Sequence, residues 1–463
     1  MFDALFTHFL LLLPMANSAI QEINVSSKIR RSSDEEVRID GISRLPDVLI
    51  QHILSFLSTK EAMATSILSK RWLPVWTSVP VIDLQDSPSC RTDSSLRLRF
   101  EHFVTRVLIL NKMACLDKFC LKFNMVDRPS CVETWFWDAV SRDVKELDIT
   151  IHGTQSFPFL KLPFIVFTAK TMQVLKLSNG VELHVTGTVS LPCLKVLHLV
   201  WIKYSSNESV SRLFAGCHVL QELVLRKYVS DNTSISDVSI QTLKILSIRF
   251  ATGRRKHQLK INAPILEYLN LEDNLGLEFD LEDVSSLVEA NVSVTWLENR
   301  HIPLLKALCN AKFVSLHWDW HSKMTWHNFR PHRLFRNLVR LELSVGYGGW
   351  NMLSLFLEIS DNLQVLVLTK NDNCRGLGLE CRWKPQKNVP ECLLSSLERV
   401  EFKGYEEVAY QLRMVKYILK NARVLKMMDI CTNGDLPLES KVDVLKKLLM
   451  FTRCSNACQL RFN

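Results

Sequence analysis

The sequence predicts an α/β solenoid, an elongated stack of strand-and-return units, preceded by a small helical domain. Short apolar pairs of the form L-x-L return along most of the chain, which is typical of repeated strands. The segment from Asp40 to Asp83 instead has the apolar spacing of short helices. Near the end of the chain, one more helix and strand follow the last of these pairs.

The first predicted helix carries an apolar stripe, and Pro46 opens its first turn. The stripe consists of residues at helical spacing: Leu45, Leu49, Ile53, Leu54 and Leu57. Isolated helices shorter than roughly 12 to 15 residues are marginal in water. We therefore expect this stripe to dock on a partner.

Two further short helices follow in the same segment. Thr59 is a suitable N-cap for the second helix, and Ser69 for a third segment that carries Trp72 and Trp76. Pro74 lacks a backbone donor, so the third helix is predicted to be kinked or to start late.

These residues resemble the F-box of the plant F-box, leucine-rich-repeat and FBD family. The resemblance rests on Leu45-Pro46 with Leu49, on the run from Ile53 to Leu57, and on the run from Ser66 to Trp72 that ends at Trp76. It implies a three-helix F-box that docks on the Skp-type linker of a cullin-RING ubiquitin ligase, and through the linker on a cullin. The linker-binding residues implied by the resemblance are Leu45, Pro46, Leu49, Ile53, Leu54, Leu57, Ser69, Arg71 and Trp72.

The long middle of the chain is predicted to be a repeat array. Its apolar pairs recur mostly at the roughly 20 to 29 residues that are typical of leucine-rich repeats. They are Leu147/Ile149, Leu175/Leu177, Leu197/Leu199, Leu223/Leu225, Leu246/Ile248, Leu269/Leu271, Ala290/Val292, Val314/Leu316, Leu341/Leu343 and Leu366/Leu368. The returns between strands are helical or irregular, most clearly a helix predicted from Glu208 to Gln221. Such units must stack to bury their apolar edges.

Three runs in this array resemble the repeats of the same family. They lie at Leu191–Tyr204, Phe214–Leu225 and Ala263–Leu271. His218, in a loop, and Gln221, at a solvent position, differ from the Pro and Glu that members of the family commonly carry there. The resemblance implies an irregular leucine-rich-repeat horseshoe that holds a protein substrate.

The C-terminal segment contains a predicted helix and strand. Val408, Leu412, Val415, Ile418 and Leu419 share one helical face, and Arg423 to Ile430 reads as a strand. By resemblance this is an FBD-like unit that closes the array. The residues that carry the resemblance are Tyr405, Glu406, Leu412, Val415, Lys416, Asn421, Ala422 and Leu425.

The predicted domains are a leader at 1–38, the F-box at 39–86, leucine-rich repeats at 95–388 and the FBD-like segment at 389–463. In the leader, the run from Phe9 to Pro14 weakly resembles a secretion signal, but it is too short to span a bilayer and lacks a basic flank. Met15 offers a second possible start. A secreted repeat receptor stays open as an alternative, testable through glycosylation at Asn24, Asn207, Asn232 and Asn291.

Composition favours an intracellular protein. The 463 residues are 47% hydrophobic and 23% charged, and 13 scattered cysteines fit reduced thiols better than a disulfide framework. We expect the cytoplasm and/or the nucleus. The net charge of +9 has one dense cluster, Arg254 to His257, which is best interpreted as a solvated loop tip, so no nucleic-acid partner is expected. No membrane partner is expected either.

No catalytic or cofactor motif stands out. Phosphate-loop, dinucleotide, nucleophile-elbow and H-E-x-x-H patterns do not occur in the sequence. His317, Asp319 and His321 share a strand face, which is more simply polar surface than a metal site, and Cys374/Cys381 and Cys454/Cys458 lack zinc spacing. Neighbouring Trp318, Trp320 and Trp326 suit packing or ligand contact.

We therefore expect a non-catalytic adaptor with no cofactor and no metal: the substrate-recognition subunit of a Skp-cullin-F-box (SCF) ubiquitin ligase. A non-degradative F-box and repeat scaffold, which binds proteins without promoting ubiquitin transfer, is the alternative.

Overall fold

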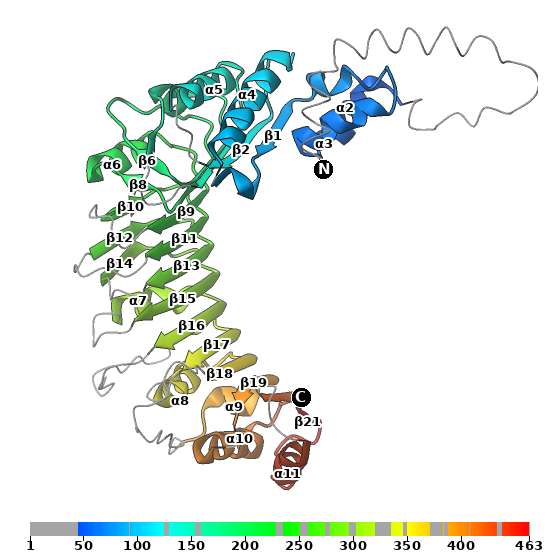
Figure 1. The fold of residues 1–463 in the computed structure, drawn as a ribbon. Coiled ribbons are helices and arrows are strands. Elements are labelled where there is room, and N and C mark those ends of the chain that lie inside the picture. Colours follow the sequence, from blue (N-terminus) through cyan, green and yellow to red (C-terminus); the bar gives the residue numbers. More distant parts are fainter. Residues whose placement is uncertain are drawn as a thin grey trace, which may run out of the picture. The chain divides into compact units, whose positions relative to one another are not determined.

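The computed structural model describes residues 45–462, except 92, 125–128, 153–158, 228–234, 251–257, 274–277, 296–301, 320–334, 346–349, 371–382, 384–387, 407 and 433–437. The chain divides into two compact units, Met1–Ile50 and Gln51–Asn463, and the boundary lies inside the first described helix. One long parallel sheet runs through the second unit (Figure 1).

This sheet has 15 strands, and each strand pairs in parallel with the next one in the order of the chain. The strands are β1 (Val81–Gln85), β2 (Lys118–Asn124), β3 (Glu146–His152), β5 (Val174–Asn179), β7 (Val196–Val200), β9 (Glu222–Lys227), β11 (Ile245–Phe250), β13 (Tyr268–Asp273), β15 (Glu289–Thr295), β16 (Phe313–Asp319), β17 (Arg340–Val345), β18 (Val365–Lys370), β19 (Arg399–Tyr405), β20 (Met427–Thr432) and β21 (Gln459–Phe462). Every predicted apolar pair lies on one of them. The α/β solenoid is confirmed.

The apolar pairs form continuous buried rows across the sheet. Leu147 of β3 is in register with Leu175, which is in register with Leu197. The same row continues strand by strand to Met428 on β20, and its members are buried. Burying one large aliphatic side chain contributes roughly 1.5–3 kcal/mol. Each repeat unit gains this stabilisation only by stacking on its neighbours.

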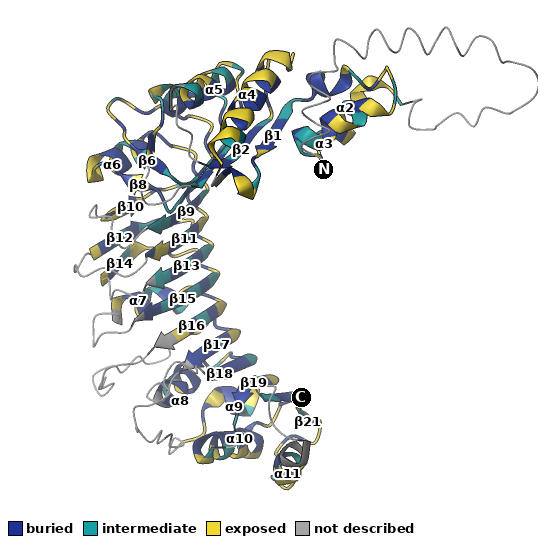
Figure 2. Ribbon diagram, viewed as in Figure 1, coloured by how far each residue is buried: buried dark blue, intermediate teal, exposed yellow. Residues whose placement is uncertain are grey.

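The connections between successive strands lie on the core side of the sheet. They contain helices and short strands. The helical returns are η5 (Pro88–Arg91), α4 (Ser94–Leu110), α5 (Pro129–Ser141), η6 (Phe164–Thr168), α6 (Asn207–Ala215), α7 (Ile302–Ala307), η8 (Leu308–Asn310), α8 (Trp350–Ile359), α9 (Glu391–Ser395), α10 (Ala409–Asn421) and α11 (Leu438–Leu449). Two three-stranded parallel sheets complete this layer: β4 (Leu160–Lys161), β6 (Val181–Leu183) and β8 (Lys203–Tyr204), then β10 (Asp237–Ser239), β12 (Gln258–Asn262) and β14 (Glu278–Asp283). Figure 2 shows α4 with both buried and exposed stretches, as expected for an amphipathic cover.

The helix predicted over Glu208 to Gln221 is shorter in the structure. It ends at Ala215, and Gly216 forms its C-cap. A Cβ added at Gly216 would lie 2.5 Å from Cγ1 and 2.7 Å from the carbonyl oxygen of Val189. Two neighbouring returns therefore touch at this point, where only glycine leaves enough room.

The sheet begins before its first predicted strand. β1 lies within the range predicted for the F-box, and β2 precedes Leu147/Ile149. β2 is buried at five of its seven residues, so it lacks the strict alternation by which strands such as β3 and β7 can be recognised.

At the C-terminal end, the FBD-like segment supplies three strands rather than one. The predicted helix is α10, and the strand predicted over Arg423 to Ile430 is β20, which starts later, at Met427. Helix α11 and β21 then add a further unit. β21 pairs only with β20 among the described strands, so the sheet stays open at this edge.

Candidate functional site

The predicted F-box consists of short helical pieces. They are α2 (Asp47–Leu54), α3 (Thr59–Ala64), η3 (Thr65–Ile67) and η4 (Val75–Ser78). The third helix starts late, as Pro74 predicts: residues 70–74 are turns, and Pro74 precedes the 3-10 helix η4 without a side-chain cap. Ser69 therefore does not cap a continuous helix.

The N-cap of α3 is Ser58, one residue before the predicted Thr59. The backbone N–H of Ser58 donates to the Glu61 carboxylate at 3.0 Å, and the Ser58 hydroxyl also donates to it at 2.7 Å. These hydrogen bonds lower the pKa of Glu61, the side-chain hydroxyl contributing most. Together with the Glu61 N–H, they form a capping box that fixes the start of α3.

The interior of this helical segment is apolar and well covered. Its buried side chains in the second unit include Leu54, Met63, Trp72, Val75 and Trp76. Leu54 is 1% exposed and Trp72 is 5% exposed, so both of these predicted linker-binding residues lie inside the segment in this conformation. Their role in linker binding stays a prediction.

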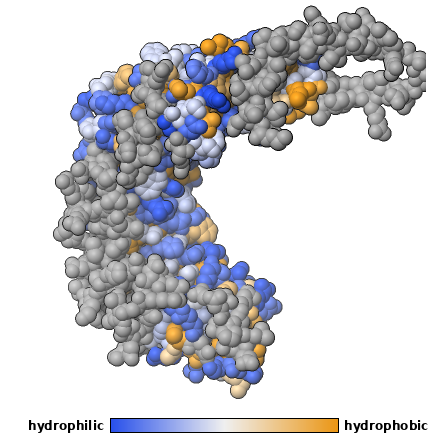
Figure 3. Space-filling model, viewed as in Figure 1, coloured by the Kyte–Doolittle hydropathy of each residue, from blue (hydrophilic) through white to orange (hydrophobic). Residues whose placement is uncertain are grey.

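Several large apolar side chains of the same segment face solvent. We call Ile53, Phe56, Leu57, Ile67 and Leu68 the F-box apolar surface. Phe56 is 76%, Ile67 83% and Leu68 65% exposed. Figure 3 shows apolar surface over the segment that carries α2 and α3. Scattered exposed apolar residues are ordinary, but five within sixteen residues indicate a surface that binds another protein.

The other predicted linker-binding residues are also accessible in part. Leu45 and Ser69 are half-buried, while Pro46, Leu49 and Arg71 are exposed. The predicted set omits Phe56, Ile67 and Leu68. Phe56 lies three residues after Ile53, so helical spacing could have found it. Ile67 and Leu68 lie where α3 gives way to 3-10 geometry, which the spacing does not reveal.

Contacts join the helical segment to the first units of the sheet. The backbone N–H of Asp83 on β1 donates to the hydroxyl of buried Thr59 at 2.8 Å. The N–H of Lys112 donates to the Thr77 carbonyl at 2.7 Å. The Asn111 side chain donates to the Val79 carbonyl at 3.0 Å. Because these bonds reach both β1 and the connection between α4 and β2, the segment from Thr59 to Val79 is anchored to the first units of the sheet.

The sheet face opposite the core forms the second candidate surface, and we call it the open sheet face. It consists of the residues that alternate with the buried pairs, such as Lys176 and His198. Ion pairs cross from strand to strand on this face. Glu146 approaches Lys118 and Lys176, each at 3.4 Å, and His198 Nε2 lies 2.7 Å from Glu222. Burial is the largest single influence on Lys118 and would lower its pKa, but attraction by Glu146, Cys120 and Asp83 together with the hydrogen bond to Glu146 raises the pKa.

Comparison with known proteins assigns these parts to families. The F-box domain family matches residues 42–83, "FBD-associated F-box protein At5g56370, LRR repeats" matches 132–290, and FBD matches 384–430. The F-box/FBD/LRR-repeat protein At4g26340 of Arabidopsis thaliana is 32% identical over 434 residues, which cover 92% of this chain and 100% of that protein. At2g04230, with the same description and source, is 34% identical over 444 residues, covering 91% and 97%.

The chain belongs to the F-box/FBD/LRR-repeat family. The F-box implies binding of a Skp-type partner in the context of a ubiquitin ligase, and leucine-rich repeats imply binding of a substrate in general. Proteins that combine these domains are typically non-catalytic adaptors. This member is accordingly an F-box adaptor-type protein.

Cysteines of this F-box/FBD/LRR-repeat protein form no disulfide bond with one another where the structure describes them. Burial raises the pKa of Cys120, Cys217 and Cys392 to about 12. The Cys217 thiol also donates to the Leu213 carbonyl at 3.1 Å. These thiols are packing groups rather than nucleophiles. Cys454 is exposed and Cys458 buried, whereas Cys374 and Cys381 lie outside the described residues.

No cluster of His, Cys, Asp or Glu in the described ranges has the arrangement of a metal site. His317 is exposed on β16, and the side chains of Trp318 and Asp319 are not described. Other sequence candidates also lie outside the described residues: the leader, Asn24, Asn232, Arg254 to His257, Trp320, His321, Trp326, His327 and His332. Every described helix is too short or too polar to span a lipid bilayer.

Proposed function

We propose that this protein is the substrate-recognition adaptor of an SCF-type E3 ubiquitin ligase. Its F-box docks on a Skp-type linker, the linker connects it to a cullin, and the repeats hold a protein substrate for ubiquitination. The observation that carries the proposal is the F-box apolar surface, whose five side chains are exposed although they belong to a folded helical segment.

Docking would remove this surface from water. Full burial of a large apolar side chain contributes about 1.5–3 kcal/mol, and Phe56, Ile67 and Leu68 are each mostly exposed in the free chain. Binding energy in protein interfaces concentrates in a few such side chains. The linker-binding residues are therefore proposed to be the exposed ones, joined by the predicted Leu45, Pro46, Leu49, Ser69 and Arg71.

In this proposal the adaptor promotes ubiquitin transfer only by positioning the substrate. An adaptor that holds a substrate near a charged ubiquitin-conjugating enzyme raises the effective concentration of its lysines without a nucleophile of its own. The bonds that anchor Thr59 to Val79 on the sheet support this role, because a substrate on the first repeats would keep a fixed position relative to that part of the F-box.

The cytoplasm and/or nucleus is proposed as the location, where thiols stay reduced. Exposed free thiols at Cys115, Cys193 and Cys454 are compatible with such a compartment.

Co-purification tests the ligase role. The full chain is expressed in plant cells with an affinity tag and purified with its bound proteins, which are identified by mass spectrometry. We expect both a Skp-type linker and a cullin with the wild-type chain, and neither with Phe56→Asp/Leu68→Asp. Met450→Asp, at an equally exposed apolar residue outside the F-box, is the matched control and should retain both.

Two outcomes would overturn the proposal. A linker without a cullin would establish the non-degradative scaffold instead. Equal recovery of the linker by the wild type and Phe56→Asp/Leu68→Asp would show that the F-box apolar surface does not bind the linker.

A further inference from the structure

The open sheet face changes character between β9 and β16. Strand register aligns its side chains in three rows that cross the strands. The first row is Glu222, Ile245, Tyr268, Glu289 and Phe313. The middle row is Val224, Ser247, Asn270, Asn291 and Ser315, and the last row is Arg226, Arg249, Glu272, Ser293 and His317.

The middle row is uncharged over these five strands and charged on both sides of them. Before this stretch the same row carries Asp83 on β1, Asp148 on β3, Lys176 on β5 and His198 on β7, and after it the row carries Glu342, Glu401 and Asp429 on β17, β19 and β20. Glu342, Glu401 and Asp429 would repel an anionic partner on the flank after β16, whereas the stretch from β9 to β16 carries no carboxylate in this row. The row therefore marks one limited site on a long face.

Within this stretch, polar groups present hydrogen-bonding atoms to solvent. The Asn270 amide donates to the Ser247 hydroxyl at 3.1 Å, and the Asn291 amide donates to the Tyr268 hydroxyl at 3.0 Å. Each bond uses the amide nitrogen. The amide oxygens of Asn270 and Asn291 accept no hydrogen bond from the described residues. Two such oxygens on neighbouring strands suit the backbone N–H groups of an extended peptide.

The first row adds apolar surface beside these amides. Ile245 is 38% and Phe313 39% exposed, and Tyr268 lies between their strands with its ring held by the bond to Asn291. An apolar side chain of a ligand would find contact here. Glu289, in the same row, disfavours a carboxylate at this position.

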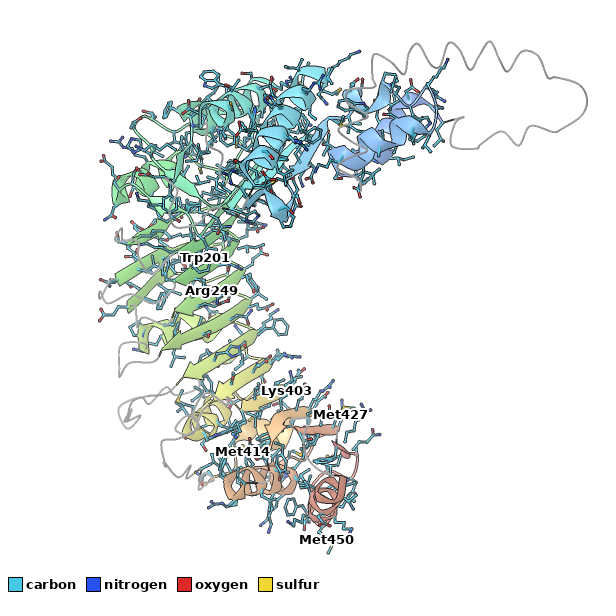
Figure 4. All side chains as sticks on the ribbon, viewed as in Figure 1. Trp201, Arg249, Lys403, Met414, Met427 and Met450 are labelled. Atoms are coloured by element: carbon cyan, nitrogen blue, oxygen red, sulfur yellow. The ribbon has the colours of Figure 1, made fainter. Side chains whose placement is uncertain are left out.

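The last row carries two arginines, Arg226 and Arg249. Arg249 is compensated by Glu272 at 3.1 Å (Arg249 is labelled in Figure 4). Arg226 on the neighbouring strand is half-buried and has no carboxylate partner among the described residues. A guanidinium binds a carboxylate through two parallel N–H groups. Because Arg226 lies next to the uncharged middle row, that carboxylate would meet no repulsion there.

We propose that the open sheet face at β9–β16 binds an extended, unmodified segment of the substrate polypeptide with one apolar and one acidic side chain. The first and last rows are four residues apart along the strands, or roughly 13 Å at about 3.3 Å per residue. The acidic side chain therefore binds Arg226, and the apolar side chain about four residues away lies over Ile245 and Tyr268. This inference rests on the proposed role of the repeats in holding a substrate.

Peptide selection on the purified full-length chain tests this inference. A phage-displayed library of random dodecapeptides is panned on the wild type and on Arg226→Glu. The matched control is Lys122→Glu, which reverses a cation of the same row on β2, outside the uncharged stretch. The wild type and Lys122→Glu should enrich peptides in which Asp or Glu lies about four residues from a large apolar residue. Arg226→Glu should lose the acidic enrichment at least tenfold.

Ile245→Asp provides a second, independent readout, because it should remove the apolar preference and leave the acidic one. The inference is overturned if no peptide is enriched, if the selected peptides are basic, or if wild type and Arg226→Glu select the same peptides. Linker binding is measured on the same variants. Linker binding without peptide selection overturns only this inference, whereas peptide selection without linker binding overturns the ligase role.

Discussion

At the scale of single residues, the buried thiols offer a direct check on the packing of the repeats. Cys120 lies on β2, Cys217 follows α6 and Cys392 lies on α9, so the three sample separate parts of the solenoid. Burial raises the pKa of each to about 12 from an ordinary value of 9.0. In contrast, Cys193 and Cys454 are exposed.

We predict that alkylation of the native chain at pH 8 modifies Cys193 and Cys454 and leaves Cys120, Cys217 and Cys392 unmodified. Peptide mapping by mass spectrometry identifies the modified cysteines. A urea-unfolded sample is the control, in which all of these thiols should react. Labelling of the buried thiols in the native chain as fast as the exposed ones would contradict the packing described above.

The same pKa values predict how stability depends on pH. Above pH 9 the unfolded chain loses protons from these thiols, while the folded chain holds them until pH approaches 12. The free energy of unfolding should therefore fall as pH rises from about 9 to about 12. Below pH 9 both states keep these protons, so the thiols make stability neither rise nor fall with pH. Cys217→Ala should show a shallower fall in urea unfolding midpoint over this window.

At the scale of elements, α3 protects the first strand of the sheet. Thr59 is predicted from the sequence as a helix cap, yet the cap is Ser58 and the Thr59 hydroxyl accepts a hydrogen bond from Asp83 on β1. An edge strand exposes backbone donors and acceptors that need partners. One side-chain hydroxyl thus links the F-box to the solenoid.

Replacing Thr59 with valine should leave the Asp83 N–H without its acceptor and lower the free energy of unfolding by about 1–3 kcal/mol. Amide hydrogen exchange at Asp83 should become faster. Thr65→Val is the matched control, because the Thr65 hydroxyl makes a local hydrogen bond, to the Ala62 carbonyl of α3 at 2.6 Å, and none to β1. If both variants are equally stable and Asp83 exchange is unchanged, α3 does not protect β1 in this way.

Most strands could be predicted from sequence, and the reason is physical. A strand with one buried and one open face alternates strictly, as Leu147 and Ile149 do on β3. β2 is buried on both faces in part, so its pattern is ambiguous. Two strands of the second layer, β4 and β8, escaped prediction because they contain two residues each, too few for any period.

The candidate sites were harder to predict than the fold. The stripe from Leu45 to Leu57 identifies the helix but not which of its side chains turns inward, and Leu54 is buried while Ile53 is exposed. The row of Ser247, Asn270 and Asn291 depends on strand register, which a single sequence does not specify.

At the scale of the whole molecule, the proposed function joins a linker-binding F-box to a substrate-binding sheet face in one chain. Because α3 is bonded to β1, deleting the F-box would also expose the first strand of the sheet. Substitutions on the F-box apolar surface separate linker binding from folding, and they are therefore the appropriate variants for the central test.

The most direct test is a titration of the purified full-length chain with a recombinant plant Skp-type linker by isothermal calorimetry. Ile67→Asp places a charge on the most exposed member of the F-box apolar surface, and Met450→Asp places one on a residue of similar exposure, 86%, beyond α11. The account predicts that Ile67→Asp weakens binding by roughly 30-fold or more, or about 2 kcal/mol, and that Met450→Asp binds like the wild type. Unchanged affinity of a folded Ile67→Asp variant, or no binding by the wild type, would contradict it.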